Sequence, residues 1–279
     1  MVITNEQSVK LKSLLLEMLS WFHDFCVDNN LRYYVVGGTM LGAVRHQGFI
    51  PWDDDIDVGM PRPDYIRLAK LLKKHTGRYV LETPYTERMD FYYPISKLYD
   101  TETTLVENTR YKVKRGIYLD IFPLDGTGNS EEESMSFFRN IKCQRNLLLA
   151  LTTGIREGRN FWKNAAILLM RCVPDWLLNK KRMLLSLDKL SQQKSFDQSE
   201  WVGNMMGNWM ERELMPRQVL GTPTQYLFGS LKVFGPEDYD GYLTSLYGNW
   251  RELPPPDKRK SHHDYLYIDL ENSYLYIEK

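Results

Sequence analysis

Four aspartates in a run of five residues stand out in the first third of the chain. The run is Asp53-Asp54-Asp55-Ile56-Asp57. From Asp55 to Met60 polar and apolar residues alternate, which predicts a strand with Asp55 and Asp57 on the same face. Two carboxylates that close repel each other, so either one keeps its proton or a divalent cation joins them. Their oxygens suit hard ions, and the pattern therefore indicates a site for Mg²⁺, with Mn²⁺ as the alternative.

Two further features fit the same chemistry. Asp120 is flanked by apolar residues within the segment Tyr118 to Phe122, and an acid in such surroundings needs a partner, which a metal would supply. Gly37 and Gly38 precede a predicted helix, where small residues and free backbone N–H groups suit a phosphate. Acids on neighbouring strands can hold one or two Mg²⁺ ions, which orient phosphates and activate an attacking hydroxyl.

Less specific interpretations apply to the same acids. A run of acidic residues is usually a solvated face, and this alternative stays open for Asp53 and Asp54. Asp120 taken alone is more often an ordinary acid at a strand edge than a ligand. A calcium-binding loop would need Gly at its sixth position and Glu at its twelfth. Val58 and Asp64 occupy those positions, which excludes the loop.

The predicted elements would position these residues close together. Thr4 to Gln7 fits a capping box, which starts a helix over residues 5–29. The tyrosines and valines of residues 32–36 predict a strand that Gly37-Gly38 ends. Further patterns predict helices over 39–46, from Pro63 toward Gly77 and over 239–247, strands at 79–83, 92–99 and 116–122, and a mostly helical region over 130–198.

Composition excludes several classes of protein. The 279 residues are 43% hydrophobic, enough for a packed core, and 36 basic residues balance 36 acidic ones. Zero net charge argues against a nucleic-acid binder with a basic face. Cys26, Cys143 and Cys172 are far apart and predict buried thiols in a reducing compartment. The longest purely apolar run, 165–170, is far below the roughly 20 residues of a membrane span, so a cytoplasmic protein is expected.

Two segments resemble the LicD family. The first is the stretch from Gly38 through Arg45 and Trp52 to Val58, and the second runs from Tyr239 through Gly248 and Trp250 to Ser261-His262-His263. The family comprises bacterial phosphocholine transferases that act on surface glycans, with fukutin-type proteins as relatives. The resemblance implies an α+β fold, a nucleotidyltransferase-like mixed sheet with flanking helices. It places the catalytic core at 1–129, a helical insertion at 130–200 as a possible acceptor or membrane-surface region, and a mixed segment completing the domain at 201–279.

The resemblance also implies a site and a reaction. Carried over by position, Gly37-Gly38 precede the Asp-x-Asp pair Asp55 and Asp57, and Asp120 is the third catalytic and metal-binding acid. Family members use CDP-linked donors such as CDP-choline and release CMP as the headgroup phosphate moves to a sugar hydroxyl of a teichoic acid, lipopolysaccharide or capsule precursor. Transfer of glycerol phosphate or another polyol phosphate, and an inactive glycan-binding module, are the alternatives. The expected substrate-binding residues are Gly37, Gly38, Thr39, Arg45, His46, Trp52, Lys97 and Arg115.

Two secondary expectations concern aromatic and apolar residues. Phe161, Trp162 and the run 167–170 lie among Arg156, Arg159, Lys163 and Arg171, which fits either an interfacial helix at the inner face of the membrane or a buried core helix. Family acceptors can be lipid-linked glycans. A choline headgroup would be held against aromatic faces, and the aromatic residues near the site elements are Trp52, Phe91, Tyr92, Tyr93 and Tyr99.

Overall fold

The computed structural model describes residues 3–86, 91–154, 160–171, 179–261 and 263–275. Of the residues considered above, Arg156, Arg159, Cys172 and His262 lie outside these ranges. The described residues form a mixed α/β fold, so the predicted α+β class is confirmed.

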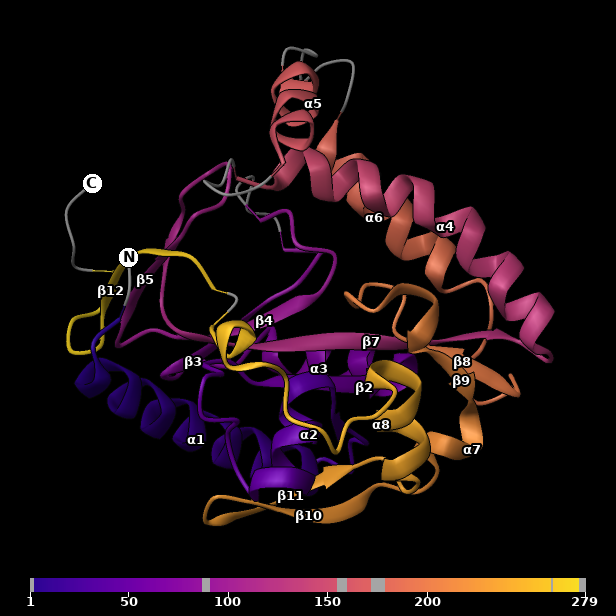
Figure 1. The fold of residues 1–279 in the computed structure, drawn as a ribbon, viewed down its shortest axis with the longest axis horizontal. Helices are drawn as coiled ribbons and strands as arrows, with labels where there is room; N and C mark the ends of the chain where they lie inside the picture. The colour runs from indigo at the N-terminus through magenta and orange to yellow at the C-terminus, as the bar shows by residue number, and fades with distance from the viewer. Residues whose placement is uncertain (1–2, 87–90, 155–159, 172–178, 262, 276–279) are drawn as a thin grey trace.

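A mixed seven-stranded sheet forms the centre of the fold (Figure 1). Its main path runs β1 (Tyr34–Val35), β2 (Asp57–Pro61), β7 (Tyr118–Gly128), β4 (Ser96–Asp100) and β3 (Tyr79–Glu82). Strands β2 and β7 are parallel, and the other pairs on this path are antiparallel. The far end of β7 pairs with β8 (Trp201–Gly203), which pairs with β9 (Leu214–Pro216), so the chain returns to the same sheet after residue 200.

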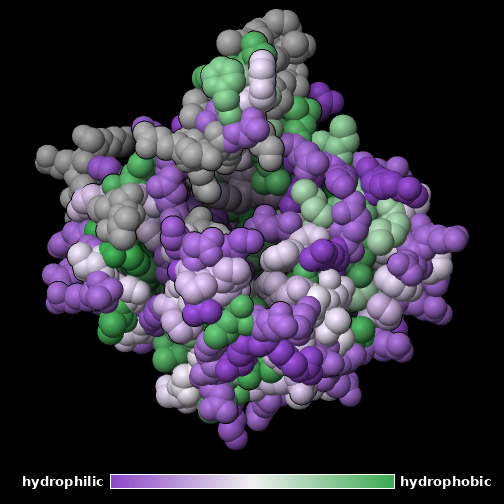
Figure 2. All heavy atoms as spheres, in the orientation of Figure 1, coloured by the Kyte–Doolittle hydropathy of each residue, from purple (hydrophilic) through white to green (hydrophobic). Residues whose placement is uncertain are grey.

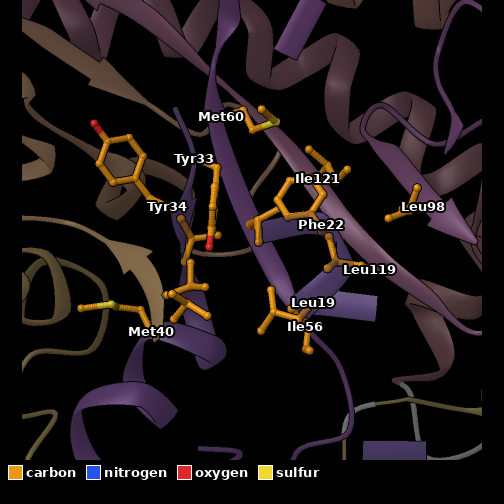
Figure 3. Close-up of a cluster of buried hydrophobic side chains, with 14 of the residues drawn as sticks. Leu19, Phe22, Tyr33, Tyr34, Met40, Ile56, Met60, Leu98, Leu119 and Ile121 are labelled. Carbon is orange, nitrogen blue, oxygen red and sulfur yellow. The ribbon is translucent and has the colours of Figure 1, made fainter. Parts of the chain in front are cut away.

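Helix α1 (Asn5–Asp28) covers the apolar face of this sheet. A capping box between Thr4 and Gln7 starts it, as the sequence predicted. Because side chains alternate along a strand, Leu98, Leu119 and Ile121 point to the face opposite their polar neighbours. Figure 3 shows this core, in which residues of α1 meet residues of β2, β4 and β7. The labelled members are Leu19, Phe22, Tyr33, Tyr34, Met40, Ile56, Met60, Leu98, Leu119 and Ile121.

Helices α2 (Gly37–His46) and α3 (Arg62–Leu72) also border the sheet, and smaller elements surround it. A second sheet joins β12 (Tyr265–Asp269), β5 (Thr104–Glu107) and β6 (Lys114–Arg115). A hairpin is formed by β10 (Thr224–Phe228) and β11 (Leu231–Gly235). The C-terminal part adds α7 (Arg217–Leu220), α8 (Tyr239–Tyr247) and the 3-10 turns η1 (Met210–Glu213) and η2 (Pro256–Lys258).

An arm of helices rises from the end of the sheet (Figure 1). It consists of α4 (Glu131–Thr152), α5 (Phe161–Arg171) and α6 (Lys180–Ser191). A separate apolar cluster, which includes Phe138, Leu148 and Leu187, holds α4 and α6 together. Helix α5 stands at the outer end of the arm, and its Phe161 and Trp162 side chains are 74% and 76% exposed. Among the described residues, no helix combines the length and apolarity needed to cross a bilayer.

Three predicted strands begin or end at other residues than expected. The strand expected at 92–99 begins only at Ser96, because Pro94 has no N–H to give to a neighbouring strand. The strand expected from Asp55 begins at Asp57, where pairing with β7 starts, so Asp55 lies in the preceding loop. Strand β7 continues to Gly128, well beyond the expected end near Phe122. The helix predicted over 239–247 is confirmed.

Candidate active site

Four charged residues lie in register across four adjacent strands. Asp57 on β2 is opposite Asp120 on β7, and Asp120 is opposite Lys97 on β4. Lys97 is in turn opposite Glu82 on β3. Register partners point to the same face of a sheet, so this row occupies the face opposite the core of Figure 3. Figure 2 shows the surface hollowed between the arm and the sheet, close to where β4 and β7 lie in Figure 1.

Asp57 and Asp120, two of the three acids in this row, carry a large electrostatic cost. Burial raises the pKa of Asp57 well above its usual range, and the charges of Asp55 and Asp120 raise it further. Burial also raises the pKa of Asp120, although Lys97 opposes that shift. Asp53 belongs to the same group, since burial and the charge of Asp55 raise its pKa to about 7. Such a cluster of acids gains stability from a cation.

Lys97 supplies the positive charge nearest to Asp120. Its ammonium nitrogen lies 2.9 Å from Asp120 Oδ1 and 3.9 Å from Glu107 Oε2. The same nitrogen is 3.3 Å from the centre of the Tyr118 ring and 4.5 Å from that of Tyr93. The sequence proposed Lys97 as a phosphate partner, and the structure places it directly beside the acids.

The start of α2 lies against the acid cluster. A Cβ atom on Gly37 would lie 3.3 Å from Asp57 Oδ2, and one on Gly38 would lie 2.6 Å from Asp53 Oδ2. Gly37 also has a φ of +54°, which favours glycine. The hydroxyl of Thr39 accepts a hydrogen bond from the Asp57 backbone N–H at 2.9 Å. Gly37, Gly38 and Thr39 therefore border the acid cluster, with the positive end of the helix dipole facing the acids.

A distant C-terminal segment completes the cluster. His263 Nδ1 lies 2.9 Å from Asp54 Oδ1, and its Nε2 lies 3.5 Å from Asp55 Oδ2. The Ser261 hydroxyl donates to the same Asp54 oxygen at 2.8 Å. Burial alone would lower the pKa of His263, but the hydrogen bond to Asp54 and the charge of Asp55 outweigh it and raise the pKa to about 9. His263 is thus a cation that bridges two acids.

The sequence did not assign His263 a role, because a solvent-facing imidazole is the ordinary case. The available signal was its place in the second segment that resembles the LicD family. Glu107, which neighbours Lys97, gave no signal at all, since an acid at the end of a strand is unremarkable.

Three other expected residues lie apart from the acids. Arg45 lies eight positions after Gly37 on the helix, a rise of about 12 Å. The Arg45 guanidinium donates to the Trp250 carbonyl at 3.0 Å. His46 contacts that guanidinium at 3.1 Å and packs edge-on against Trp52. These residues fasten the end of α2 to the C-terminal segment. None of their described contacts is to an acid of the cluster.

Arg115 is also engaged elsewhere. Its Nε lies 3.1 Å from both carboxylate oxygens of Glu82, and both side chains are buried. The sequence expected Arg115 to bind phosphate. A buried guanidinium that is already paired with a carboxylate would have to abandon that partner first, which is costly.

The carboxylate oxygens of this cluster suit a hard cation, although the described residues form no complete metal-binding site. Among them, no three acid, histidine or cysteine side chains are grouped as metal ligands. Two buried oxygens in the described cluster, Asp54 Oδ2 and Asp120 Oδ1, lack a hydrogen-bond partner. The Lys97 ammonium is close to the second but outside hydrogen-bond geometry. Mg²⁺ usually takes one or two carboxylates and completes its shell with water and phosphates, so Asp57 and Asp120 fit it.

Comparison with known proteins shows which class of domain contains these residues. Residues 30–161 match the family model described as LicD/FKTN/FKRP, nucleotidyltransferase domain. These residues are therefore similar to a LicD-type nucleotidyltransferase domain, and the chain is a transferase, as the sequence predicted.

The most extensive of the reported matches is to a bacterial enzyme. The chain is 28% identical over 258 residues to the lipopolysaccharide cholinephosphotransferase LicD of Haemophilus influenzae, a match covering 89% of this chain and 92% of that protein. A shorter match, 40% identical over 52 residues, links it to ribitol 5-phosphate transferase FKRP of Homo sapiens and Mus musculus, covering 19% of this chain and 10% of those proteins.

Proposed function

We propose that this transferase moves phosphocholine from CDP-choline to a sugar hydroxyl of a cell-surface glycan precursor and releases CMP. Homology over most of the chain to a lipopolysaccharide cholinephosphotransferase supports the headgroup and the class of acceptor. The observation that carries the proposal is the row of Asp57, Asp120 and Lys97 in register beside the start of α2. Acids, an ammonium and a helix N-terminus in one place fit a diphosphate and its metal.

Asp57 and Asp120 are the proposed ligands of Mg²⁺, and Asp55 stands close enough for its charge to act on both. When bound, the metal neutralises charge on the diphosphate and on the departing CMP. Lys97 adds a second positive charge beside Asp120. Mn²⁺ prefers similar oxygen ligands and is the expected substitute.

The chain's own residues then position and deprotonate the acceptor. The hydroxyl oxygen of the sugar forms a bond to the phosphorus that carries the headgroup, and the bond from this phosphorus to the bridging oxygen breaks. CMP leaves with the bonding electron pair, and the hydroxyl proton moves to the Asp120 carboxylate. His263 and Ser261 hold Asp54, so the loop before β2 keeps Asp55 in place during transfer.

Transfer of a polyol phosphate is the second candidate. It is favoured by the match to a ribitol 5-phosphate transferase, which covers only 52 residues. The same acids and the same metal would serve either headgroup, because only the group beyond the phosphate differs. An inactive glycan-binding module is disfavoured by the intact Asp55, Asp57 and Asp120.

A peripheral position at the cytoplasmic face of a membrane is part of the proposal. Phe161, Trp162, Leu168 and Leu169 of α5 are all more than half exposed, at the tip of the arm. The helix also contains Lys163 and Arg171 and no acid. Apolar residues combined with basic ones suit an anionic lipid surface, where a lipid-linked acceptor would be found. Figure 2 shows hydrophobic residues exposed at this tip.

A panel of CDP-alcohols with CMP release as the readout tests the function. The purified protein is incubated with CDP-choline, CDP-glycerol or CDP-ribitol, with Mg²⁺ and a lipopolysaccharide or teichoic acid precursor as acceptor. We expect release with CDP-choline and transfer of phosphocholine to the glycan. CMP release only with CDP-glycerol or CDP-ribitol would show that the transferred headgroup is a polyol and not choline. CMP release from none of the three donors would refute the proposed reaction.

A further inference from the structure

Beside the row of charges lies a small cavity that is lined in part by aromatic side chains. It has a volume of about 20 Å³. The aromatic walls come from two strands and from the segment before β4, and an acid closes one side. These lining residues are Phe91, Tyr93, Tyr99, Tyr118 and Glu107. The ion pair between Glu82 and Arg115 also borders the cavity.

The acid in this wall is a buried carboxylate whose hydrogen bonds come from the aromatic walls. The Tyr118 hydroxyl donates to Glu107 Oε1 at 2.6 Å, and the Tyr93 hydroxyl donates to Oε2 at 2.8 Å. Burial alone would raise the pKa of Glu107, but Lys97 and these two hydroxyls lower it below its usual range. The cavity therefore combines ring faces with a fixed negative charge.

The same rings already contact a cation. The Lys97 ammonium lies over the Tyr118 ring at 3.3 Å and over the Tyr93 ring at 4.5 Å. An ammonium is attracted to the negative face of an aromatic ring. The local field of Tyr93, Tyr118 and Glu107 thus favours positive charge in the unliganded protein.

The cavity is also at the right distance from the site of transfer. Tyr118 precedes Asp120 by two residues on β7, so both side chains point to the same face about 7 Å apart. In phosphocholine an ethylene link joins the phosphate oxygen to the quaternary nitrogen. A phosphate held at Asp120 would therefore bring that nitrogen to the rings of Tyr118 and Tyr93.

We propose that the cavity of Phe91, Tyr93, Tyr99, Tyr118 and Glu107 is the binding site for the quaternary ammonium of the donor. This inference rests on the proposed function. A cavity of this volume holds about one water molecule, so entry of a trimethylammonium group requires a side chain to move. Tyr93 is the wall residue suited to this, because it lies on a loop and is only partly buried.

The hydrogen bonding of the walls disfavours a polyol. A glycerol or ribitol headgroup needs donors and acceptors for its hydroxyls, and burying it without them is costly. The hydroxyls of Tyr93 and Tyr118 are both engaged by Glu107. Apart from the Glu82–Arg115 ion pair, whose charges offset each other, the cavity offers ring faces and the Glu107 carboxylate, which suits a cation that cannot donate hydrogen bonds.

Equilibrium binding to CDP-choline, CDP-glycerol and CMP in Mg²⁺ tests the proposal. The variants are Tyr93→Leu, Glu107→Gln and Tyr93→Phe. Tyr92→Leu is the matched control, since Tyr92 packs against Tyr111 and does not line the cavity. The wild type should prefer CDP-choline over CDP-glycerol by about tenfold. Tyr93→Leu and Glu107→Gln should lose this preference while binding CMP as before. Tyr93→Phe and Tyr92→Leu should keep most of it.

The outcomes separate the cavity from the reaction. If both Tyr93→Leu and Glu107→Gln keep the tenfold preference, the cavity does not hold the headgroup, whatever the reaction is. If Tyr93→Leu or Glu107→Gln fails to bind CMP because its fold is damaged, the donor preference of the other variant tests the proposal. A wild type that prefers CDP-choline yet releases no CMP with any glycan would refute the reaction and leave the binding site standing. No preference in the wild type overturns the proposed binding site.

Discussion

Asp57 and Asp120 are register partners on neighbouring parallel strands, but only one of them has a cation beside it. Lys97 lies 2.9 Å from Asp120. In the described part of the chain, no ion pair involves Asp57. Asp57 therefore carries an uncompensated electrostatic cost in the metal-free protein, while Asp120 is partly compensated. This asymmetry predicts different effects for the same substitution at the two positions.

We expect Asp57→Asn to remove activity without harming the fold. The substitution relieves repulsion with Asp55 and Asp120, so the melting temperature of the metal-free protein should stay equal or rise by a few degrees. CMP release should fall by roughly 100-fold or more, as when a transition state loses one main electrostatic partner. Added Mg²⁺ should raise the melting temperature of the wild type and have little effect on the variant.

Asp120→Asn serves as the contrasting variant. It should lose activity equally, but it leaves the buried Lys97 ammonium without its nearest carboxylate. Breaking a buried pair in this way costs about 3 kcal/mol, which chemical denaturation would detect. Equal stability of the two variants would show that Lys97 is held mainly by Glu107 and the tyrosine rings.

His263 should act through the proposed metal site. Partners that orient metal ligands change metal affinity or activity by roughly 10–100-fold when they are removed. We therefore expect His263→Ala to weaken Mn²⁺ binding by about tenfold, measured by electron paramagnetic resonance of the free ion. His75→Gln is the control, because the His75 ring packs against Trp21 of α1, at the other side of the sheet. Unchanged Mn²⁺ affinity in His263→Ala would limit its role to holding the C-terminal segment.

The sequence predicted the acids of the site but not how they are compensated. Asp57 follows from alternation along one strand and Asp120 from its apolar neighbours on another, and both patterns are local properties. The pairing of Lys97 with Asp120 depends on the register of β4 against β7, and no spacing in the chain reveals a register. His263 reaches Asp54 from more than two hundred residues away, so only the fold shows that contact. The position of Arg45 away from the acids likewise follows from the length of helix α2.

Glu213 should make stability fall as the pH rises. Burial raises the pKa of this carboxyl to about 7, although the Trp209 N–H and Arg145 oppose the shift. Between about pH 4.5, where the unfolded chain loses this proton, and pH 7, the native state binds the extra proton. The free energy of unfolding therefore decreases across this range, by up to about 3 kcal/mol from this group.

Glu213→Gln should flatten that profile and make the protein more stable at pH 8. Urea unfolding at pH 5 and pH 8 would measure the difference. Glu252→Gln on the exposed surface is the control and should leave the profile unchanged. If Glu213→Gln loses as much stability as the wild type between pH 5 and pH 8, other groups cause the pH dependence.

The tip of the arm should bind anionic membranes. The Trp162 and Leu169 side chains are 76% and 72% exposed on α5, at the outer end of the arm. Burying such a side chain in lipid contributes about 1.5–3 kcal/mol, so each of Trp162→Glu and Leu169→Glu should weaken partitioning by at least about tenfold. Co-sedimentation with vesicles that contain anionic lipid, at low salt, is the measurement. Val9→Glu is the control, because Val9 is 71% exposed on α1, away from the arm. No binding by the wild type, or an equal loss with Val9→Glu, would refute a membrane role for α5. If high salt and both arm variants abolish binding, the active site lies beside the lipid surface.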